Sequence, residues 1–272
     1  MNASGKRVGS VEYEIVAVRY ATQQERGAGS NFLFPDDHSA PMPIDYFVWA
    51  ITGGGRTIVV DTGFDAVAAA RRERALLRST AEALALVGIE AAGVRDVVLT
   101  HLHYDHAGCM EAFPAAIFHL QDAEMAFATG RCMCHRVLRI PMEVEDVLTA
   151  VRHVYAERVR FHAGTAEIAP GVTLHLVGGH SGGLQVVRVP TARGHVVLAS
   201  DAAHFWANIR TRNPFPLVVD VGRMAEGWRI CEELADGPDH IIPGHDPLVL
   251  TRFPTLQGQP DVALLHEPPR TA

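Results

Sequence analysis

Hydrophobic and polar residues follow one another along the chain in two patterns, one typical of strands and one typical of helices. Residues 11–20 alternate between apolar and polar positions, which predicts a strand with one buried face. Apolar, β-branched runs predict further strands at residues 44–52, 57–60, 94–100, 116–120, 172–177, 184–189, 196–199 and 240–242. Apolar positions at helical spacing predict helices at residues 65–87, 122–128, 143–159 and 221–235.

The order of these segments predicts an α+β fold. Each half of the chain contains strand runs together with helices, which indicates two sheets packed as a sandwich and covered by helices. No linker or low-complexity stretch separates the halves, so we expect one domain over residues 1–272. Residues 23–43 are rich in Gly, Asp, Ser and Pro and predict a long surface loop, and loops of this length are commonly functional.

Composition excludes several classes of function. The chain has 24 Lys and Arg against 31 Asp and Glu, so its formal charge of -7 gives no general attraction to nucleic acid or to anionic membranes. No apolar run approaches the length needed to span a bilayer, and residues 1–10 lack the apolar core of a signal peptide. Four cysteines in a chain of this size suit reduced thiols. We therefore expect a cytoplasmic protein without nucleic-acid or membrane partners.

The fifteen histidines are the unusual feature, and four possible metal ligands gather after the strand at residues 94–100. They are His101, His103, Asp105 and His106, in an H-x-H-x-D-H pattern. Alternation at the strand end sends His101 and His103 to one side, and the turn that follows presents Asp105 and His106 to a neighbouring point. Imidazole and carboxylate ligands suit zinc or a similar first-row ion, so the pattern predicts two adjacent metal sites.

Three more candidate ligands follow apolar runs farther along the chain. His180 lies in a Gly-Gly-His-Ser-Gly turn, Asp201 follows the strand at 196–199, and His245 follows Ile241 and Ile242 in Pro-Gly-His-Asp. Each residue alone is as readily structural as functional. The repetition of strand, turn and ligand is what a site along one edge of a sandwich requires.

In the order and spacing of these motifs the sequence resembles the metallo-β-lactamase superfamily over nearly its whole length. The segment Val-Val-Asp-Thr-Gly at residues 59–63 is similar to the first motif of the family, in which the aspartate, here Asp61, supports the site without binding metal. The resemblance implies an αββα sandwich of two mixed β-sheets and two divalent ions, expected to be zinc. It implies that His101, His103 and His180 hold one ion, that Asp105, His106 and His245 hold the other, and that Asp201 bridges them.

Two adjacent ions point to hydrolysis, because they lower the pKa of a shared water and place a hydroxide beside an electrophilic carbonyl. The sequence contains no G-x-S-x-G nucleophile motif. By resemblance, Asp105 has a catalytic role besides ligation, since it can hydrogen-bond the bridging hydroxide and deliver a proton to the leaving oxygen.

Within the superfamily the chain resembles N-acyl homoserine lactone lactonases. Secreted β-lactamases have an export signal, glyoxalase-II-like thioesterases have a basic C-terminal helical region, and the nucleases have basic surfaces, and none of these features is found here. We expect a small lactone as substrate and a monomer or homodimer. Hydrolysis of another cyclic ester or amide, a thioesterase, and a non-catalytic binding protein remain alternatives, although the complete ligand set favours an enzyme.

Four residues are candidate contacts for the substrate. Phe32, Met42 and Tyr46, in and beside the 23–43 loop, could line a pocket for an acyl chain or could simply pack against the sandwich. His204 stands where typical homoserine lactone lactonases have a tyrosine, and it could donate a hydrogen bond to the substrate carbonyl or merely pack. With an ordinary pKa near 6.5, it could also make the rate depend on pH in the neutral range.

The sequence Cys132-Met133-Cys134-His135 resembles part of a zinc knuckle. No second cysteine pair lies nearby to complete four ligands, so we favour a loop or lid near the site over a third, structural metal.

Overall fold

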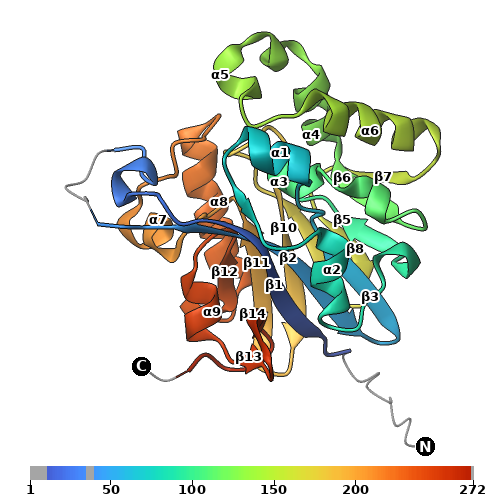
Figure 1. The fold of residues 1–272 in the computed structure, drawn as a ribbon, viewed down its shortest axis with the longest axis vertical. Coiled ribbons are helices and arrows are strands. Elements are labelled where there is room, and N and C mark those ends of the chain that lie inside the picture. Colours follow the sequence, from blue (N-terminus) through green and yellow to red (C-terminus); the bar gives the residue numbers. More distant parts are fainter. Residues whose placement is uncertain (1–10, 35–39, 271–272) are drawn as a thin grey trace, which may run out of the picture.

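The computed structural model describes residues 11–34 and 40–270. Residues 1–10, in which the sequence has no signal-peptide core, and residues 35–39 of the 23–43 loop lie outside the described residues. Figure 1 gives the arrangement of the elements. Within the described chain, the first sheet has nine strands, in the order β13 (Thr255–Leu256), β14 (Gln259–Leu264), β1 (Glu14–Gln23), β2 (Ile44–Gly53), β3 (Arg56–Val60), β5 (Asp96–Val98), β6 (Ile117–Gln121) and β7 (Val159–His162), with β4 (Ala75–Leu76) also paired to β1.

The second sheet has five strands in the described chain, in the order β12 (Ile241–Pro243), β11 (Gly194–Ser200), β10 (Gln185–Thr191), β9 (Val172–Leu176) and β8 (Ala166–Ala169). Both sheets are mixed, since β3, β5, β6 and β7 pair in parallel in the first, and β11 and β12 do so in the second.

The helices flank these sheets (Figure 1). Their bounds are α1 (Ala66–Arg71), α2 (Thr80–Ala85), α3 (Tyr104–Ala107), α4 (Asp122–Thr129), α5 (Arg136–Arg139), α6 (Val144–Tyr155), α7 (Trp206–Thr211), α8 (Val221–Leu234) and α9 (Leu248–Arg252). Single 3-10 turns are η1 (Ala28–Ser30), η2 (Ala91–Gly93), η3 (Met110–Ala112), η4 (Arg131–Cys134) and η5 (Pro238–His240). In the part of the chain that the structure describes, no helix is both long enough and apolar enough to traverse a bilayer.

The side-chain alternation of β1 to β3 explains the layers. Ile15, Trp49 and Ile58 face the second sheet and pack in one cluster with Leu174 and Val189. Their sequence neighbours face the other way because successive strand residues point to opposite faces.

That outer face of the first sheet packs against helices, and the outer face of the second sheet does the same. Val48 and Val59 lie in a cluster with Ala83 of α2. On the second sheet, Val197 packs with Cys231 of α8. The four layers are helix, sheet, sheet and helix, so the predicted αββα sandwich of two mixed sheets is confirmed.

The segment at residues 65–87, predicted to be mostly helical, is divided. Helix α1 ends before Glu73, whose φ of 55° lies in the left-handed region, and β4 then pairs with β1. Ser79 starts α2 with a capping box, in which its side chain accepts from the Glu82 backbone N–H while the Glu82 carboxylate accepts from the Ser79 N–H. Local capping, and pairing with the end of β1 beyond its contact with β14, therefore outweigh the apolar periodicity.

The Pro-containing tail also forms sheet structure, which the sequence pattern did not predict. β14 pairs antiparallel with β1, in a register that sets Ala17 against Ala263. β7 and β8 were not predicted either, because their exposed positions interrupt the apolar pattern. These short strands gain their stability from neighbours that are distant in sequence, which local patterns do not reveal.

The turn between β9 and β10 packs against the start of α4 so closely that a side chain at Gly183 would overlap the backbone N and Cα of Glu124. We expect Gly183→Ala to lower the free energy of unfolding by about 2–3 kcal/mol, since overpacking forces the backbone to shift. Gly93→Ala is the control, because a Cβ there meets no atom within 4 Å. Urea denaturation of both variants measures the difference, and equal effects would contradict this account of the turn.

Candidate metal centre

The seven predicted ligands meet where several strands end, at one edge of the sandwich. His101 and His103 follow β5, and Asp105 and His106 lie in the short helix α3. His180 lies in the turn between β9 and β10. Asp201 directly follows β11, His245 follows β12 after Gly244, and these two strands pair in parallel.

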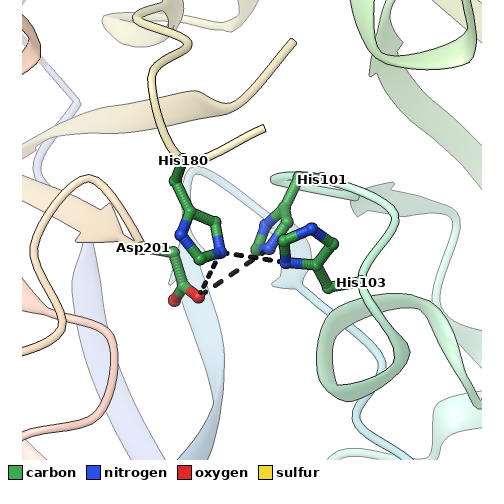
Figure 2. Close-up of side chains that lie close together, drawn as sticks. All are labelled: His101, His103, His180 and Asp201. Carbon is green, nitrogen blue, oxygen red and sulfur yellow. Dashed lines mark hydrogen bonds and ion pairs between the residues drawn. The ribbon is translucent and has the colours of Figure 1, made fainter. Parts of the chain in front are cut away.

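The carboxylate of Asp201 lies between two sets of histidines. Its Oδ2 is 3.0 Å from His180 Nε2 and 3.8 Å from His101 Nε2 (Figure 2). Its Oδ1 is 3.0 Å from His245 Nε2 and 3.3 Å from His106 Nε2. Each oxygen therefore faces a different set, which is the arrangement of a bridging carboxylate.

The donor atoms fall into two main groups, each within 4.8 Å of one another. The first contains His101, His103, His180 and Asp201, whose side chains converge in Figure 2. The second contains Asp105, His106 and His245. These are the two sets implied by the resemblance, and they offer the nitrogen and oxygen ligands that zinc prefers.

The donor set also fits metal ions because several buried atoms have no other use. Within the described residues, His101 Nε2, His106 Nε2 and Asp201 Oδ1 are buried and form no hydrogen bond of good geometry, although the last two lie 3.3 Å apart. Buried polar atoms normally have a partner, since leaving one unsatisfied costs free energy. Coordination to a metal ion would satisfy all three.

Asp61 fixes the orientation of His106 without facing the bridging carboxylate. Its Oδ2 lies 2.7 Å from His106 Nδ1, which leaves Nε2 directed at the site. The carboxylate also accepts hydrogen bonds from the Thr100 backbone N–H at 2.8 Å and from the Thr100 hydroxyl at 2.9 Å. This is the carboxylate and histidine arrangement that orients metal ligands in proteins.

Backbone carbonyls orient two other histidines. His180 Nδ1 lies 2.6 Å from the Leu217 carbonyl oxygen, and His245 Nδ1 lies 2.9 Å from the Asp45 carbonyl oxygen. A carbonyl oxygen only accepts, so each Nδ1 carries the proton and each Nε2 is free to bind an ion.

Burial keeps two of the ligands neutral. It lowers the pKa of His101 and His103 well below the ordinary value, and neighbouring histidines add to the effect. Neutral imidazole is the form that binds metal, so these two rings need not lose a proton to coordinate an ion.

A close approach of the backbone brings His245 to Asp201. A Cβ at Gly244 would lie 2.7 Å from Asp201 Oδ1 and 2.9 Å from the Ser200 carbonyl oxygen. Only glycine fits there without displacing the carboxylate, which explains the glycine before His245 in the Pro-Gly-His-Asp sequence.

Glu124 is a buried residue of the site that sequence analysis missed. Its carboxylate accepts hydrogen bonds from the Leu102 backbone N–H, the Ser181 hydroxyl and the Gly183 backbone N–H. It thereby ties the His101–His103 segment to the turn that carries His180. The isolated glutamate at the start of α4 gave no signal in the sequence, because its three partners are distant along the chain or belong to the backbone.

A cavity of about 310 Å³ opens over the ligands. Tyr46 and His204 line it, and Phe32 and Met42 are not among its lining residues. Phe32 is buried instead, and Met42 packs against the outer core of the first sheet. Of the four candidate substrate contacts, the structure brings only Tyr46 and His204 to the ligands.

The ring of His204 is held close to the ligand groups. It stacks on Phe215 with centroids 3.6 Å apart and planes 6° apart, and its Nε2 lies 3.2 Å from Asp201 Oδ2. A third group of donor atoms contains Asp201, His204 and His245. Burial lowers the pKa of His204 to about 3, so the neutral-range titration suggested by its ordinary pKa is wrong.

Cys132, Cys134 and His135 lie in and beside η4, away from the ligands. None of them belongs to a group of metal donors found in the described part of the chain. Neighbouring residues of this segment border the site, since Ile140 and Pro141 line the cavity.

The profile of the metallo-beta-lactamase superfamily matches residues 43–245, which include all seven predicted ligands. The chain belongs to the metallo-beta-lactamase superfamily.

Curated relatives within this superfamily are N-acyl homoserine lactonases. The chain is 34% identical over 135 residues to N-acyl homoserine lactonase AiiB of Agrobacterium fabrum, with 47% of each protein covered. It is 31% identical over 130 residues to the N-acyl homoserine lactonase of Bacillus cereus, which covers 47% of this chain and 46% of the relative. The chain thus spans about half the length of the curated relatives it matches.

Solved structures of this superfamily share the fold. A quorum-quenching N-acyl homoserine lactone lactonase superposes with a TM-score of 0.69 at 23% identity, covering 88% of this chain and 93% of that one. AidC, a dizinc quorum-quenching lactonase in complex with a product, gives a TM-score of 0.63 at 16% identity, covering 89% of both chains.

We expect the purified protein to contain about two transition-metal ions per chain, because the two donor groups each suit one ion. Asp105→Ala and His245→Ala should each lower the content towards one ion, since both residues belong to the second group. Elemental analysis measures this. His195→Ala, a partly exposed histidine paired with Asp236 outside the site, is the control. One ion per wild-type chain, unchanged in both site variants, would contradict a dinuclear centre.

Proposed function

We propose that the protein is a metal-dependent hydrolase that opens lactone rings, with N-acyl homoserine lactones as the first class of substrate to test. The observation that carries the proposal is the position of Asp201 between two complete donor groups. The activity of the relatives supports the choice of lactones. Hydrolysis of another small cyclic ester or amide is the alternative, because the same donor groups would serve it.

The donor groups assign the ions to particular residues. His101, His103 and His180 would hold one ion, Asp105, His106 and His245 the other, and Asp201 would bridge them. When bound, two divalent ions such as zinc supply Lewis acidity and lower the pKa of water towards neutrality. In the reaction, water adds to the lactone carbonyl carbon and the ring C–O bond breaks, which gives a carboxylate and an alcohol.

Asp105 is placed to move the proton that this reaction requires. Its Oδ2 lies 3.7 Å from both His106 Nε2 and His245 Nε2, and the residue lines the cavity. The Tyr20 hydroxyl donates to its backbone carbonyl oxygen at 3.0 Å, which fixes the start of α3. The carboxyl group can take a proton from the attacking water and return it to the leaving ring oxygen.

His204 is placed to bind the substrate carbonyl oxygen. Its Nε2 faces the donor groups, 3.2 Å from Asp201 Oδ2, and stacking on Phe215 restricts the motion of the ring. A neutral imidazole with its proton on Nε2 can donate to an oxygen on which negative charge develops.

The surroundings of the site fit a small-molecule substrate. The cavity, at about 310 Å³, is at the lower end of the range for ligand pockets.

A cytoplasmic location and a monomeric or homodimeric state remain predictions from the sequence.

We expect lactones to be hydrolysed with a kcat/KM at least about 100-fold higher than thioesters, β-lactams or phosphodiesters, equal to about 3 kcal/mol of transition-state stabilisation. Proton release measured with each class, on protein of known metal content, tests this. Turnover of a phosphodiester without turnover of any lactone would overturn the proposal.

We expect His204→Ala to lower kcat by about 100-fold while metal content is unchanged, because one oxyanion donor is lost. His204→Tyr should recover part of the loss, since its hydroxyl can also donate. Burial keeps His204 neutral, so the rate of the wild type should show no step from this ring at neutral pH.

The control for these variants is again His195→Ala. Unchanged kinetics in His204→Ala would remove the proposed role. Loss of an ion from that variant would show that His204 is a ligand, as its membership of the third donor group allows.

A further inference from the structure

Three arginines line the cavity above the candidate ligands. They are Arg26, which precedes η1, and Arg72 and Arg74, which lie between α1 and β4. Their charges are available to a bound anion only where no carboxylate of the protein already pairs with them.

Arg72 is fully engaged by the protein. Its guanidinium forms two hydrogen bonds to Glu143 Oε1, at 2.7 and 3.0 Å, and one to the Ile140 carbonyl oxygen at 3.0 Å. It also lies 3.9 Å from the centre of the Tyr104 ring. Arg72 therefore serves the structure between α1 and α6.

Among the described residues, Arg26 and Arg74 have only uncharged hydrogen-bond partners. Arg26 donates to the Asn31 side chain and to the Ser30 carbonyl oxygen. Arg74 donates to the Arg72 carbonyl oxygen at 2.6 Å and to the Tyr104 hydroxyl at 3.3 Å. Across residues 11–34 and 40–270, no carboxylate lies within ion-pair distance of either guanidinium.

The two charges are partly removed from water and close enough to repel each other. Both residues are half-buried. Burial lowers the pKa of the Arg26 guanidinium, and the charge of Arg74 adds to this effect, whereas Tyr46 and Tyr104 raise the pKa of Arg74 against the effect of burial. Partial burial of a cation that has no counter-charge among the described residues is unfavourable, so an anion entering the cavity would gain free energy from both arginines.

Tyr46 and Tyr104 connect Arg74 to the ligand side of the cavity, and Phe215 connects Arg26 to it, since the Arg26 guanidinium lies 5.2 Å from the centre of the Phe215 ring. The Tyr46 ring contacts the His245 ring edge-on, with centroids 5.1 Å apart, and its hydroxyl is 3.4 Å from that of Tyr104. Arg74 Nε donates to the Tyr104 hydroxyl at 3.3 Å. A molecule whose carbonyl is at the ligands would thus place another part of itself near the arginines.

We propose that the natural substrate is a small lactone that carries a carboxylate, which Arg26 and Arg74 bind while the ring carbonyl faces the donor groups. This inference rests on the proposed lactonase function. It places an anionic group of the substrate where an N-acyl homoserine lactone would have its acyl chain. The guanidinium fork matches the planar geometry of a carboxylate, which favours this group over a simple apolar chain. The cavity volume also suits a compact molecule.

Matched pairs of lactones test the proposal on the metal-loaded protein. One member of each pair is a homoserine lactone acylated with malonate, succinate or glutarate, and the other is its uncharged methyl amide. We expect the charged member of at least one pair to have a kcat/KM about tenfold higher, mainly through a lower KM, because a charge-assisted hydrogen bond is stronger than a neutral one.

Variants assign the preference to the two arginines. Arg26→Gln and Arg74→Gln should each lower the charged-to-neutral ratio at least fivefold, and the corresponding lysine variants should retain part of it. Arg160→Gln is the control, because Arg160 is exposed on β7, outside the cavity. Thermal unfolding of each variant separates lost recognition from a merely structural role of Arg26 in its loop.

The outcomes distinguish this inference from the proposed function. Preference for the neutral member in all three pairs, or a ratio that neither glutamine variant changes, would overturn the carboxylate site while lactonase activity stands. If no lactone is turned over, the proposed function fails, and calorimetry with glutarate and its monoamide still tests the arginines. Equal affinity of the wild type for these two compounds would then overturn the site as well.

Discussion

The carboxylate of Asp201 is the group on which the rest of the centre depends. One oxygen faces His180 and His101 and the other faces His245 and His106, so a single side chain connects the two donor groups. Burial alone would raise the pKa of this carboxyl, but the surrounding histidines hold it well below its usual range. The group is therefore an anion in the protein interior. Neighbouring imidazoles or bound cations offset the free-energy cost of burying this charge.

The residue before this aspartate is linked by hydrogen bonds to the groups that orient His106. Ser200, with a φ of 45°, turns the chain at the end of β11, and its hydroxyl lies 2.9 Å from that of Thr100. Thr100 in turn donates to Asp61, which orients His106. Strand end, turn and supporting hydrogen bonds thus form one connected unit, and a change in any of them would move a ligand.

The sequence was sufficient for the sandwich and the ligand cluster because both rest on local signals. Strand periodicity and the H-x-H-x-D-H spacing are visible within a few residues. The position of β14 beside β1 and the role of Glu124 depend on contacts between distant segments, which periodicity cannot reveal. Phe32 and Met42 were candidates for the pocket lining but pack elsewhere. The sequence could not decide this, since an apolar residue in a loop packs equally well in a core or in a pocket.

Because the ligands come from segments between residue 101 and residue 245, the centre exists only in the folded chain. Ions that bind only the native state stabilise it by mass action, by about 4 kcal/mol when free metal exceeds its dissociation constant 1,000-fold. Arg26 and Arg74 lie in loops beside the first sheet and do not belong to the donor groups. The fold therefore places the candidate donor groups and the two arginines on different segments around one cavity, so a change at either arginine removes no donor atom.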